Sequence, residues 1–243
     1  MKVGLVGFPG SGKTSAFFAL TGQQGAIGHS GKGPGKTHFA AVPVTEPSAA
    51  RIIRPRKQVV FVDVAAPPGI AGRSFDAQVM VAMREVDTLL QVVRGFASTD
   101  GSPADPVGEL TDLATEMRVG DLATIDKRLA RLHKEAPKPD ELTLLKRLRA
   151  ELEHGTPLRE VALSATEQAL IAGQQFLTQK PLVVLYNVAE SDPPSALPSD
   201  LTAYAARHTI PVVPLCSQRS DALTAHDLIP LWQAIKVCSS VGH

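Results

Sequence analysis

The chain has 243 residues, enough for one α/β domain with an insertion or for two small domains. Its hydrophobic content of 44% and formal net charge of +1 are ordinary for a soluble protein, so total charge predicts neither a nucleic-acid nor a membrane partner. No signal peptide precedes the first strand, no apolar run approaches a membrane span, and Cys216 and Cys238 lack metal-ligand neighbours. We therefore expect a cytoplasmic protein with reduced thiols.

The chain begins with a predicted strand, a glycine-rich loop and a helix. Gly7, Gly12, Lys13 and Thr14 fit the phosphate-loop pattern Gly-x4-Gly-Lys-Ser/Thr in the context that it requires. Glycines let successive N–H groups face one anion, and the helix N-terminus adds its positive dipole end. Lys13 is the predicted catalytic residue, reaching the β- and γ-phosphates, and the Thr14 hydroxyl is a predicted Mg²⁺ ligand. The predicted phosphate contacts are Gly7, Phe8, Pro9, Gly10, Ser11, Gly12, Lys13, Thr14 and Ser15.

The next region contributes candidates for the metal site. Residues 22–37 hold six glycines and end at Thr37, the nearest candidate for a metal-binding switch threonine. Strands are predicted over residues 39–44 and 59–63. The second ends in Asp63, which has the form of the acidic residue that holds Mg²⁺ through water in phosphate-loop NTPases. The alternative is a strand that simply ends on an exposed Asp.

Strands and helices alternate through the rest of the chain. A helix is predicted over 75–85, strands over 88–93, 182–187 and 211–216, and a final helix over 227–238. This alternation predicts an α/β fold with a mostly parallel sheet and helices on both faces. Ligands bind at the carboxyl ends of such strands, where Gly7, Asp63 and Asn187 fall.

Residues 110–177 have a different, helical character. Leu122, Ile125, Leu129 and Leu132 have the spacing of a coiled-coil seam, and residues 137–140 end that helix and begin another, which predicts an antiparallel hairpin. Ser164 and Glu167 have capping-box spacing for a third helix. We expect a nucleotide-binding domain of residues 1–108 and 178–243, interrupted by a helical arm of residues 109–177.

The hairpin carries uneven charge. Between residues 127 and 149, eight basic residues less three acidic ones leave a charge of +5. The ordinary interpretation is a solvated helical face. The sharper hypothesis is an arm that contacts the ribosome or RNA, because clustered Lys and Arg on a protruding element are typical of phosphate-backbone binding.

Several stretches together resemble the YchF branch of the Obg-like translation-factor GTPases. They are the phosphate loop 7–14, the stretch 84–94, the hairpin opening 121–129, the segment 155–159 and residues 187–190. The similarity covers roughly residues 1 to 220 in the same order. It implies a Ras-like P-loop NTPase domain with an inserted coiled-coil arm, use of ATP as well as or instead of GTP, and ribosome association.

The resemblance also places the base-binding residues. A guanine site commonly reads Asn-Lys-x-Asp, and here Asn187 is followed by Val188 and Glu190, so guanine selection should be weakened. The usual Ser-Ala motif that contacts the base appears as Cys216, Ser217 and Gln218. The alternative for Asn187 is a simple strand-end cap.

Three departures from the usual GTPase pattern leave an alternative function open. Ala66 replaces the usual switch glycine, and Pro67 stands where many GTPases place a water-orienting Gln; the flanks of Thr37 also differ. Family members continue into a TGS domain, whereas this chain stops at His243, either because the module is missing from a divergent paralogue or because the chain is truncated. The leading hypothesis is a Mg²⁺-dependent NTPase that slowly hydrolyses ATP or GTP. The alternative is a hydrolysis-deficient nucleotide-binding scaffold that acts through its arm.

Overall fold

The computed structural model describes residues 1–22, 38–43, 58–63, 77–98, 101–132, 134, 139–190, 197–218 and 228–241. Within these ranges the side chains of residues 38–43, 58–63, 77–78 and 239–241 are not described. The chain forms two compact units, one of residues 1–110 and 181–243 and the other of residues 111–180. None of the described helices is long and apolar enough to cross a bilayer.

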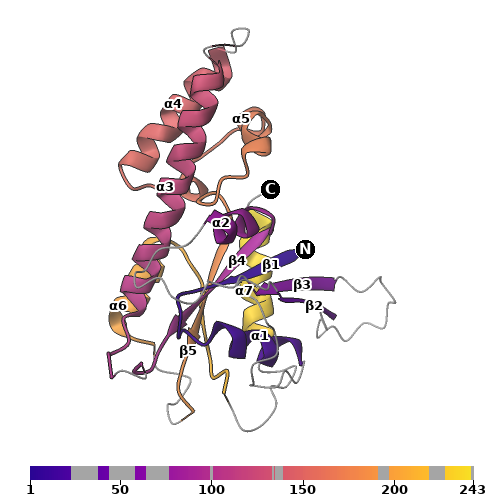
Figure 1. Ribbon diagram of the computed structural model, residues 1–243, viewed down its shortest axis with the longest axis vertical. Helices are drawn as coiled ribbons and strands as arrows, with labels where there is room; N and C mark the ends of the chain where they lie inside the picture. The colour runs from indigo at the N-terminus through magenta and orange to yellow at the C-terminus, as the bar shows by residue number, and fades with distance from the viewer. Residues whose placement is uncertain are drawn as a thin grey trace. The chain divides into compact units, whose positions relative to one another are not determined.

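A six-stranded sheet forms the centre of the first unit (Figure 1). Its strands are β1 (Lys2–Val6), β2 (His38–Pro43), β3 (Gln58–Asp63), β4 (Thr88–Arg94), β5 (Leu182–Asn187) and β6 (Val212–Leu215), in the order β2-β3-β1-β4-β5-β6. Only β2, at one edge, pairs antiparallel with its neighbour. The prediction of a mostly parallel α/β sheet is therefore confirmed, and the carboxyl ends of the five parallel strands share one edge.

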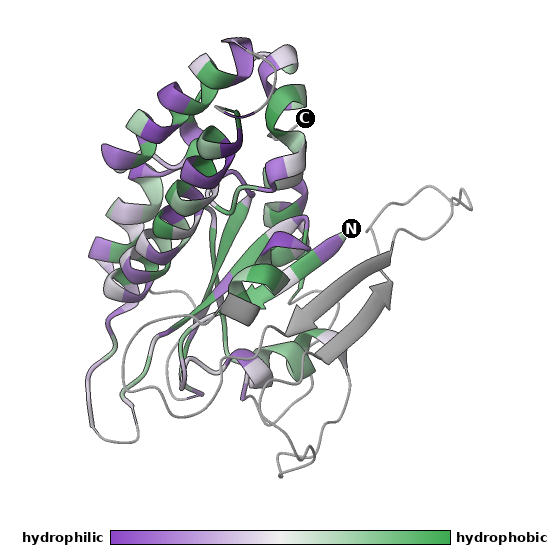
Figure 2. Cartoon of the chain, turned by 45° about the horizontal axis from the view of Figure 1, so that its top comes forward, coloured by the Kyte–Doolittle hydropathy of each residue, from purple (hydrophilic) through white to green (hydrophobic). Residues whose placement is uncertain are grey.

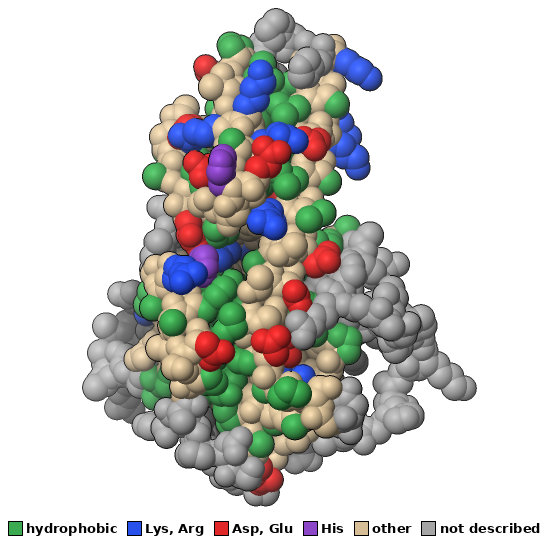
Figure 3. Space-filling model, turned by 90° about the vertical axis from the view of Figure 1, so that its left-hand side faces the viewer, with side chains coloured by type: hydrophobic (Ala, Val, Ile, Leu, Met, Phe, Trp, Pro, Cys, Tyr) green, Lys and Arg blue, Asp and Glu red, His purple; other side chains and the backbone are tan. Residues whose placement is uncertain are grey.

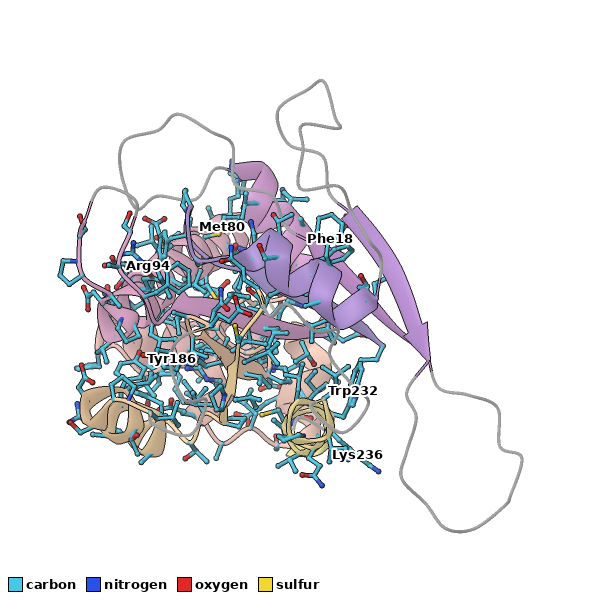
Figure 4. All side chains as sticks on the ribbon, turned by 90° about the horizontal axis from the view of Figure 1, so that it is seen from below. Phe18, Met80, Arg94, Tyr186, Trp232 and Lys236 are labelled. Carbon is cyan, nitrogen blue, oxygen red and sulfur yellow. The ribbon has the colours of Figure 1, made fainter. Side chains whose placement is uncertain are left out.

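The helices of the first unit are α1 (Lys13–Thr21), α2 (Ala77–Arg84), α6 (Ser199–Arg207) and α7 (Ile229–Val241). Alternate residues of the strands, such as Val3, Leu90 and Val183, face α1 and α7 in one buried apolar cluster. Phe18 of α1 and Trp232 of α7, both labelled in Figure 4, pack against the edge of that cluster. This face of the sheet therefore positions α1, which follows the phosphate loop.

The opposite face of the sheet is covered as well. Gly4 alternates with Val3 and Leu5, and a Cβ at Gly4 would lie 2.9 Å from Cγ2 of Val86, just after α2. The central strands β4 and β5 are buried along almost their whole length, in keeping with their hydrophobic colouring in Figure 2. Burial on both faces explains why these strands read as continuous apolar runs rather than as alternating ones.

The second unit is helical. It contains most of α3 (Pro106–Leu132), then α4 (Pro139–Glu153), α5 (Ala165–Ile171) and two short 3₁₀ turns, Leu158–Glu160 and Ala172–Gln174. Its core joins the predicted seam of α3 to the apolar stripe of α4 and to Ile171 and Phe176. Helix α5 begins at the predicted capping box, in which Ser164 and Glu167 each accept a hydrogen bond from the other's backbone N–H.

A buried carboxylate joins the ends of the second unit. Asp121 of α3 is fully buried, and its oxygens accept hydrogen bonds from the backbone N–H groups of Leu177 and Thr178 at 2.9 and 2.7 Å. The Thr178 hydroxyl donates a third at 2.8 Å. A buried charge is tolerated only where such donors replace water. Asp121 therefore fixes the return of the chain from the second unit to β5.

We predict that Asp121→Ala destabilises the second unit by about 3 kcal/mol, because three buried donors lose their acceptor. Hydrogen exchange at the amides of Leu177 and Thr178, together with thermal unfolding, would measure it. Asp126→Ala is the matched control, since Asp126 is an exposed α3 carboxylate that accepts a hydrogen bond from Arg149 on the surface. Equal effects of the two substitutions would contradict the structural role of Asp121.

Candidate functional site

The phosphate loop joins the end of β1 to the start of α1. Gly10 and Gly12 have φ values of +81° and +82°, a left-handed backbone that costs other residues steric strain. The N–H of Ser11 donates to the Phe8 carbonyl at 3.1 Å and the N–H of Ala16 to Gly12 at 2.8 Å, which closes the loop and begins the helix. Gly12 caps α1 without a side chain. The N-cap residue therefore brings no side chain that would compete with an anion for the first N–H groups of α1.

Two of the loop glycines lie where no side chain fits. An ideal Cβ at Gly7 would lie 2.6 Å from the Val92 carbonyl oxygen, and one at Gly12 would overlap Nδ2 of Asn187. Gly10 has open space around the same position. The glycines of the pattern are thus required by packing at residues 7 and 12, and at residue 10 only by backbone conformation.

Asn187 at the end of β5 ties the phosphate loop to the loop after β6. The side chain is 2% exposed; its Nδ2 donates to the Ser11 carbonyl at 2.9 Å, and its Oδ1 accepts from the Ser217 N–H at 3.1 Å. These partners fix the orientation of the amide, because one can only accept and the other can only donate. Asn187 therefore does more than cap a strand.

Each of the two loops that Asn187 joins contains a buried hydroxyl group. Oγ of Ser11 and Oγ of Ser217 are both buried, and neither has a hydrogen-bond partner among the described residues. An unpaired buried hydroxyl costs free energy unless a ligand or water satisfies it. Oγ of Ser11 lies 2.8 Å from the position of a Cβ at Gly7, and Oγ of Ser217 lies 3.5 Å from that of a Cβ at Gly12. The two unpaired hydroxyls therefore belong to the two loops that Asn187 joins.

The other predicted contacts fall around this position. Val188 is buried, and its N–H donates to the Leu215 carbonyl at 3.1 Å. Cys216 is also buried, whereas Glu190 and Gln218 are exposed. Lys13 and Ser15 are partly exposed and Thr14 is exposed at the start of α1, while Phe8 is buried and Pro9 exposed in the loop. The structure thus brings the two halves of the predicted nucleotide site together at one edge of the sheet.

The predicted metal ligands are only partly described. Asp63 is the last residue of β3 and pairs in register with Leu5, so its backbone lies near the start of the phosphate loop. Its side chain, Thr37, Ala66 and Pro67 lie outside the described residues. The described side chains contain no cluster of three His, Cys, Asp or Glu residues that could hold a metal ion. Mg²⁺ does not require such a cluster when nucleotide phosphates and water complete its coordination. A hydroxyl beside a phosphate cradle is a suitable ligand for that ion.

Sequence reasoning missed a polar network beside Asn187. Gly95 donates its N–H to the Asn187 carbonyl at 2.8 Å, and a Cβ there would lie 2.7 Å from the ring of Tyr186. The N–H of Arg94, whose side chain is labelled in Figure 4, donates to Oε2 of Glu109 at 3.2 Å. Fully buried Gln91 donates to the Glu109 carbonyl at 2.9 Å. Gln91, a polar residue within an otherwise apolar predicted strand, was the feature of the sequence that could have indicated this network.

We predict that Gly12→Ala lowers the melting temperature of the ligand-free protein more than Gly10→Ala does. Both substitutions incur the left-handed backbone cost of about 1 to 2 kcal/mol, but only the first displaces Asn187. Thermal unfolding of the two variants side by side measures the difference. Equal destabilisation would show that the contact with Asn187 is not maintained.

Asn187→Asp should destabilise the ligand-free protein and weaken nucleotide binding about tenfold or more, which corresponds to about 1.4 kcal/mol. The replacement keeps the acceptor for Ser217 but sets an oxygen against the Ser11 carbonyl. Ser217→Ala is the control for thermal stability alone, because it retains the backbone N–H that bonds Asn187 and removes only a hydroxyl without a described partner. Calorimetric titration measures nucleotide binding, and thermal unfolding measures stability. An Asn187→Asp variant as stable as the wild type would contradict the role of Asn187 in joining the two loops.

The chain was compared with known families and proteins. The family model described as "50S ribosome-binding GTPase" matches residues 2–142. Proteins named ribosome-binding ATPase YchF are similar to this chain. That of Haemophilus ducreyi is 30% identical over 207 residues, which cover 78% of this chain and 57% of the relative. That of Bacillus subtilis is 27% identical over 246 residues, which cover 90% of this chain and 66% of the relative. The chain thus spans less than two thirds of these curated relatives.

A solved structure shows the same fold. The structure of the Schizosaccharomyces pombe YchF GTPase matches 99% of this chain and 71% of its own chain with a TM-score of 0.69. The sequence identity is 19%, so this likeness concerns the fold alone.

Proposed function

The chain belongs to the 50S ribosome-binding GTPase family and, within it, to the YchF branch of the Obg-like GTPases, and on that premise we propose that it is a Mg²⁺-dependent P-loop NTPase. It binds ATP or GTP and hydrolyses the nucleotide slowly. The resemblance that the sequence indicated is confirmed at the level of the family. The observation that carries the proposal is the phosphate loop, with left-handed Gly10 and Gly12 at an N-terminus of α1 that no side chain caps.

Catalysis by such a site is mostly electrostatic. Lys13 and the backbone amides of Gly12 to Thr14 neutralise charge on the β- and γ-phosphates. The hydroxyl of Thr14 and the carboxylate of Asp63 would hold Mg²⁺, with Thr37 as a third candidate metal-site residue. The bound ion would supply further neutralisation of the phosphate oxygens. The segments that we expect the nucleotide to order, residues 22–37 and those after Asp63, lie mostly outside the described residues.

The base site favours loose selection between guanine and adenine. In the Asn-Lys-x-Asp pattern the Asp accepts from the ring N–H and the exocyclic amine of guanine, and adenine offers no such ring N–H. Here the Lys position is Val188, which is buried, and the Asp position is Glu190, one methylene longer and exposed.

The two compact units suggest a division of labour. We assign nucleotide binding to residues 1–108 and 178–243 and a partner-binding role to the arm of residues 109–177. The curated relatives carry the name ribosome-binding ATPase, and we propose ribosome association in the cytoplasm for this chain as well.

Single-turnover hydrolysis with and without ribosomes tests the proposal. We expect γ-phosphate release from ATP or GTP that falls about 100-fold or more in Lys13→Ala, since the charge on the phosphate loop contributes to the transition state. Lys2→Ala, an exposed lysine at the start of β1, should leave the rate unchanged. Nucleotide binding without release of phosphate under either condition would overturn the proposal in favour of the hydrolysis-deficient scaffold that Ala66 and Pro67 motivate.

A further inference from the structure

Glu109 is a buried carboxylate that the catalytic groups named above do not include. Figure 3 shows red Asp and Glu side chains at the surface of one face of the molecule, where carboxylates ordinarily lie, whereas Glu109 is 6% exposed. It belongs to the first turn of α3, within the first unit. The positive end of the helix dipole favours a carboxylate there, but burial removes the water that would solvate it. Polar groups of the chain must therefore replace that water.

Arg94, the last residue of β4, provides such a group. Its backbone N–H donates to Oε2 of Glu109 at 3.2 Å, and its Nε lies 3.8 Å from Oε1. The second distance is too long for a hydrogen bond, and Nε is buried without a hydrogen-bond partner among the described residues. The guanidinium instead donates from Nη2 to the Pro103 carbonyl at 3.2 Å. The hydrogen bond from Arg94 to the carboxylate is thus made by the backbone.

The direction of this N–H explains why it needs a carboxylate. Gly95 donates its N–H to the Asn187 carbonyl of β5 at 2.8 Å. Successive residues of a strand face opposite neighbours, so Arg94 faces the side of β1. The pairing of β1 with β4 ends at Val6, where the chain turns into the phosphate loop. Glu109 therefore supplies the acceptor that a longer β1 would have provided.

The end of β4 lies tightly against Asn187. An ideal Cβ at Gly95 would lie 2.9 Å from the Asn187 carbonyl oxygen and 2.7 Å from the ring of Tyr186, which is labelled in Figure 4. A shift of this part of β4 therefore displaces the backbone of Asn187. The side chain of that residue makes the hydrogen bonds to Ser11 and Ser217 that join the two loops of the candidate site.

A separate contact holds the backbone of Glu109. Fully buried Gln91, earlier in β4, donates from Nε2 to the Glu109 carbonyl at 2.9 Å. Glu109 is thus attached to β4 both through its backbone and through its carboxylate. A variant that lacks the carboxylate keeps the contact with Gln91, so the first turn of α3 stays on the sheet while the end of β4 loses its acceptor.

We propose that Glu109 is a positioning residue for nucleotide binding. Its carboxylate fixes the end of β4 and, through Gly95, sets the position of Asn187 between the phosphate loop and the loop after β6. Glu109 itself contacts neither the nucleotide nor the metal, and the catalytic groups remain those of the phosphate loop. The inference rests on the proposed NTPase function and adds to it a residue outside the phosphate loop and the base-contacting segments.

Substitutions of Glu109 in the full chain separate the acceptor from the charge. Glu109→Gln keeps the length of the side chain and an oxygen for the Arg94 N–H, so its nucleotide affinity should stay within about threefold of the wild type. Glu109→Asp keeps the charge but is one methylene shorter, and Glu109→Ala removes the acceptor. Both should weaken the binding of ADP and of ATP with Mg²⁺ about tenfold, since a buried donor is left unpaired.

Asp105→Ala is the matched control at the start of the same helix. Asp105 accepts the Gly108 N–H at 2.9 Å, so its removal weakens the first turn of α3 without removing the acceptor of the Arg94 N–H. This variant should unfold at a lower temperature and keep its nucleotide affinity within about threefold. Equal losses of affinity in Asp105→Ala and Glu109→Ala would overturn the proposal, because any damage to the helix start would then have the same effect.

Calorimetric titration measures the affinity, and single-turnover hydrolysis at saturating ATP measures the chemical step. Glu109→Ala should raise the ATP concentration for half-maximal rate about tenfold and change the rate at saturation less than about threefold, because binding is lost while the catalytic groups stay. A merely structural role would lower the melting temperature and leave the affinity unchanged. Weakened binding in Glu109→Gln with full affinity in Glu109→Asp would also overturn the proposal.

A double-mutant cycle tests the connection through Asn187. In an Asn187→Ala background, Glu109→Ala should weaken binding less than about threefold, because the amide that it positions is absent. The full tenfold loss in that background would overturn the connection. A wild-type chain that binds no nucleotide would refute the proposed function, whereas wild-type binding with unchanged affinity in Glu109→Ala and Glu109→Asp would refute this inference alone.

Discussion

The candidate nucleotide site depends on one amide side chain. Asn187 is 176 residues from Ser11 in the sequence, yet its Nδ2 bonds the carbonyl of the phosphate loop while its Oδ1 holds the loop after β6. The close packing of Gly12 against that amide leaves no space for a Cβ. The same contact therefore fixes the position of the phosphate loop and of the residues that would contact a base. The phosphate loop and the candidate base contacts are joined by two hydrogen bonds rather than by a shared element of secondary structure.

The main-chain carbonyl of Asn187 extends this connection toward α3. It accepts the N–H of Gly95, next to Arg94, and Arg94 and Gln91 both bond Glu109 in the first turn of α3. The guanidinium of Arg94 also donates to the Pro103 carbonyl at 3.2 Å. These contacts all lie within the first unit. They attach the first turn of the long helix to the edge of the sheet that carries the candidate site, through buried polar groups whose loss would be costly.

Paired arginines hold the helices of the second unit together. The planar guanidinium can hold two oxygens at once, as Arg128 does with Glu141, and it is suited to fixed pairs between helices. A lysine ammonium on a flexible stem gains little from such geometry. Lys127 and Lys134 are exposed, and neither forms an ion pair with a residue that the structure describes. A count of charges along the hairpin treats these residues alike. Their contacts divide them into cations that are paired with carboxylates and cations that are exposed.

The sequence by itself determined the local elements. Glycine, lysine and threonine spacing placed the phosphate loop, apolar periodicity placed the strands and the hairpin seam, and Ser164 with Glu167 placed the start of α5, because each signal involves residues within a few turns of one another. Only the tertiary structure decided that Asn187 spans two loops, that Asp121 holds residues 177 and 178, and which basic residues are paired. Hydrogen bonds between distant residues depend on strand order and side-chain direction, which a linear pattern does not specify.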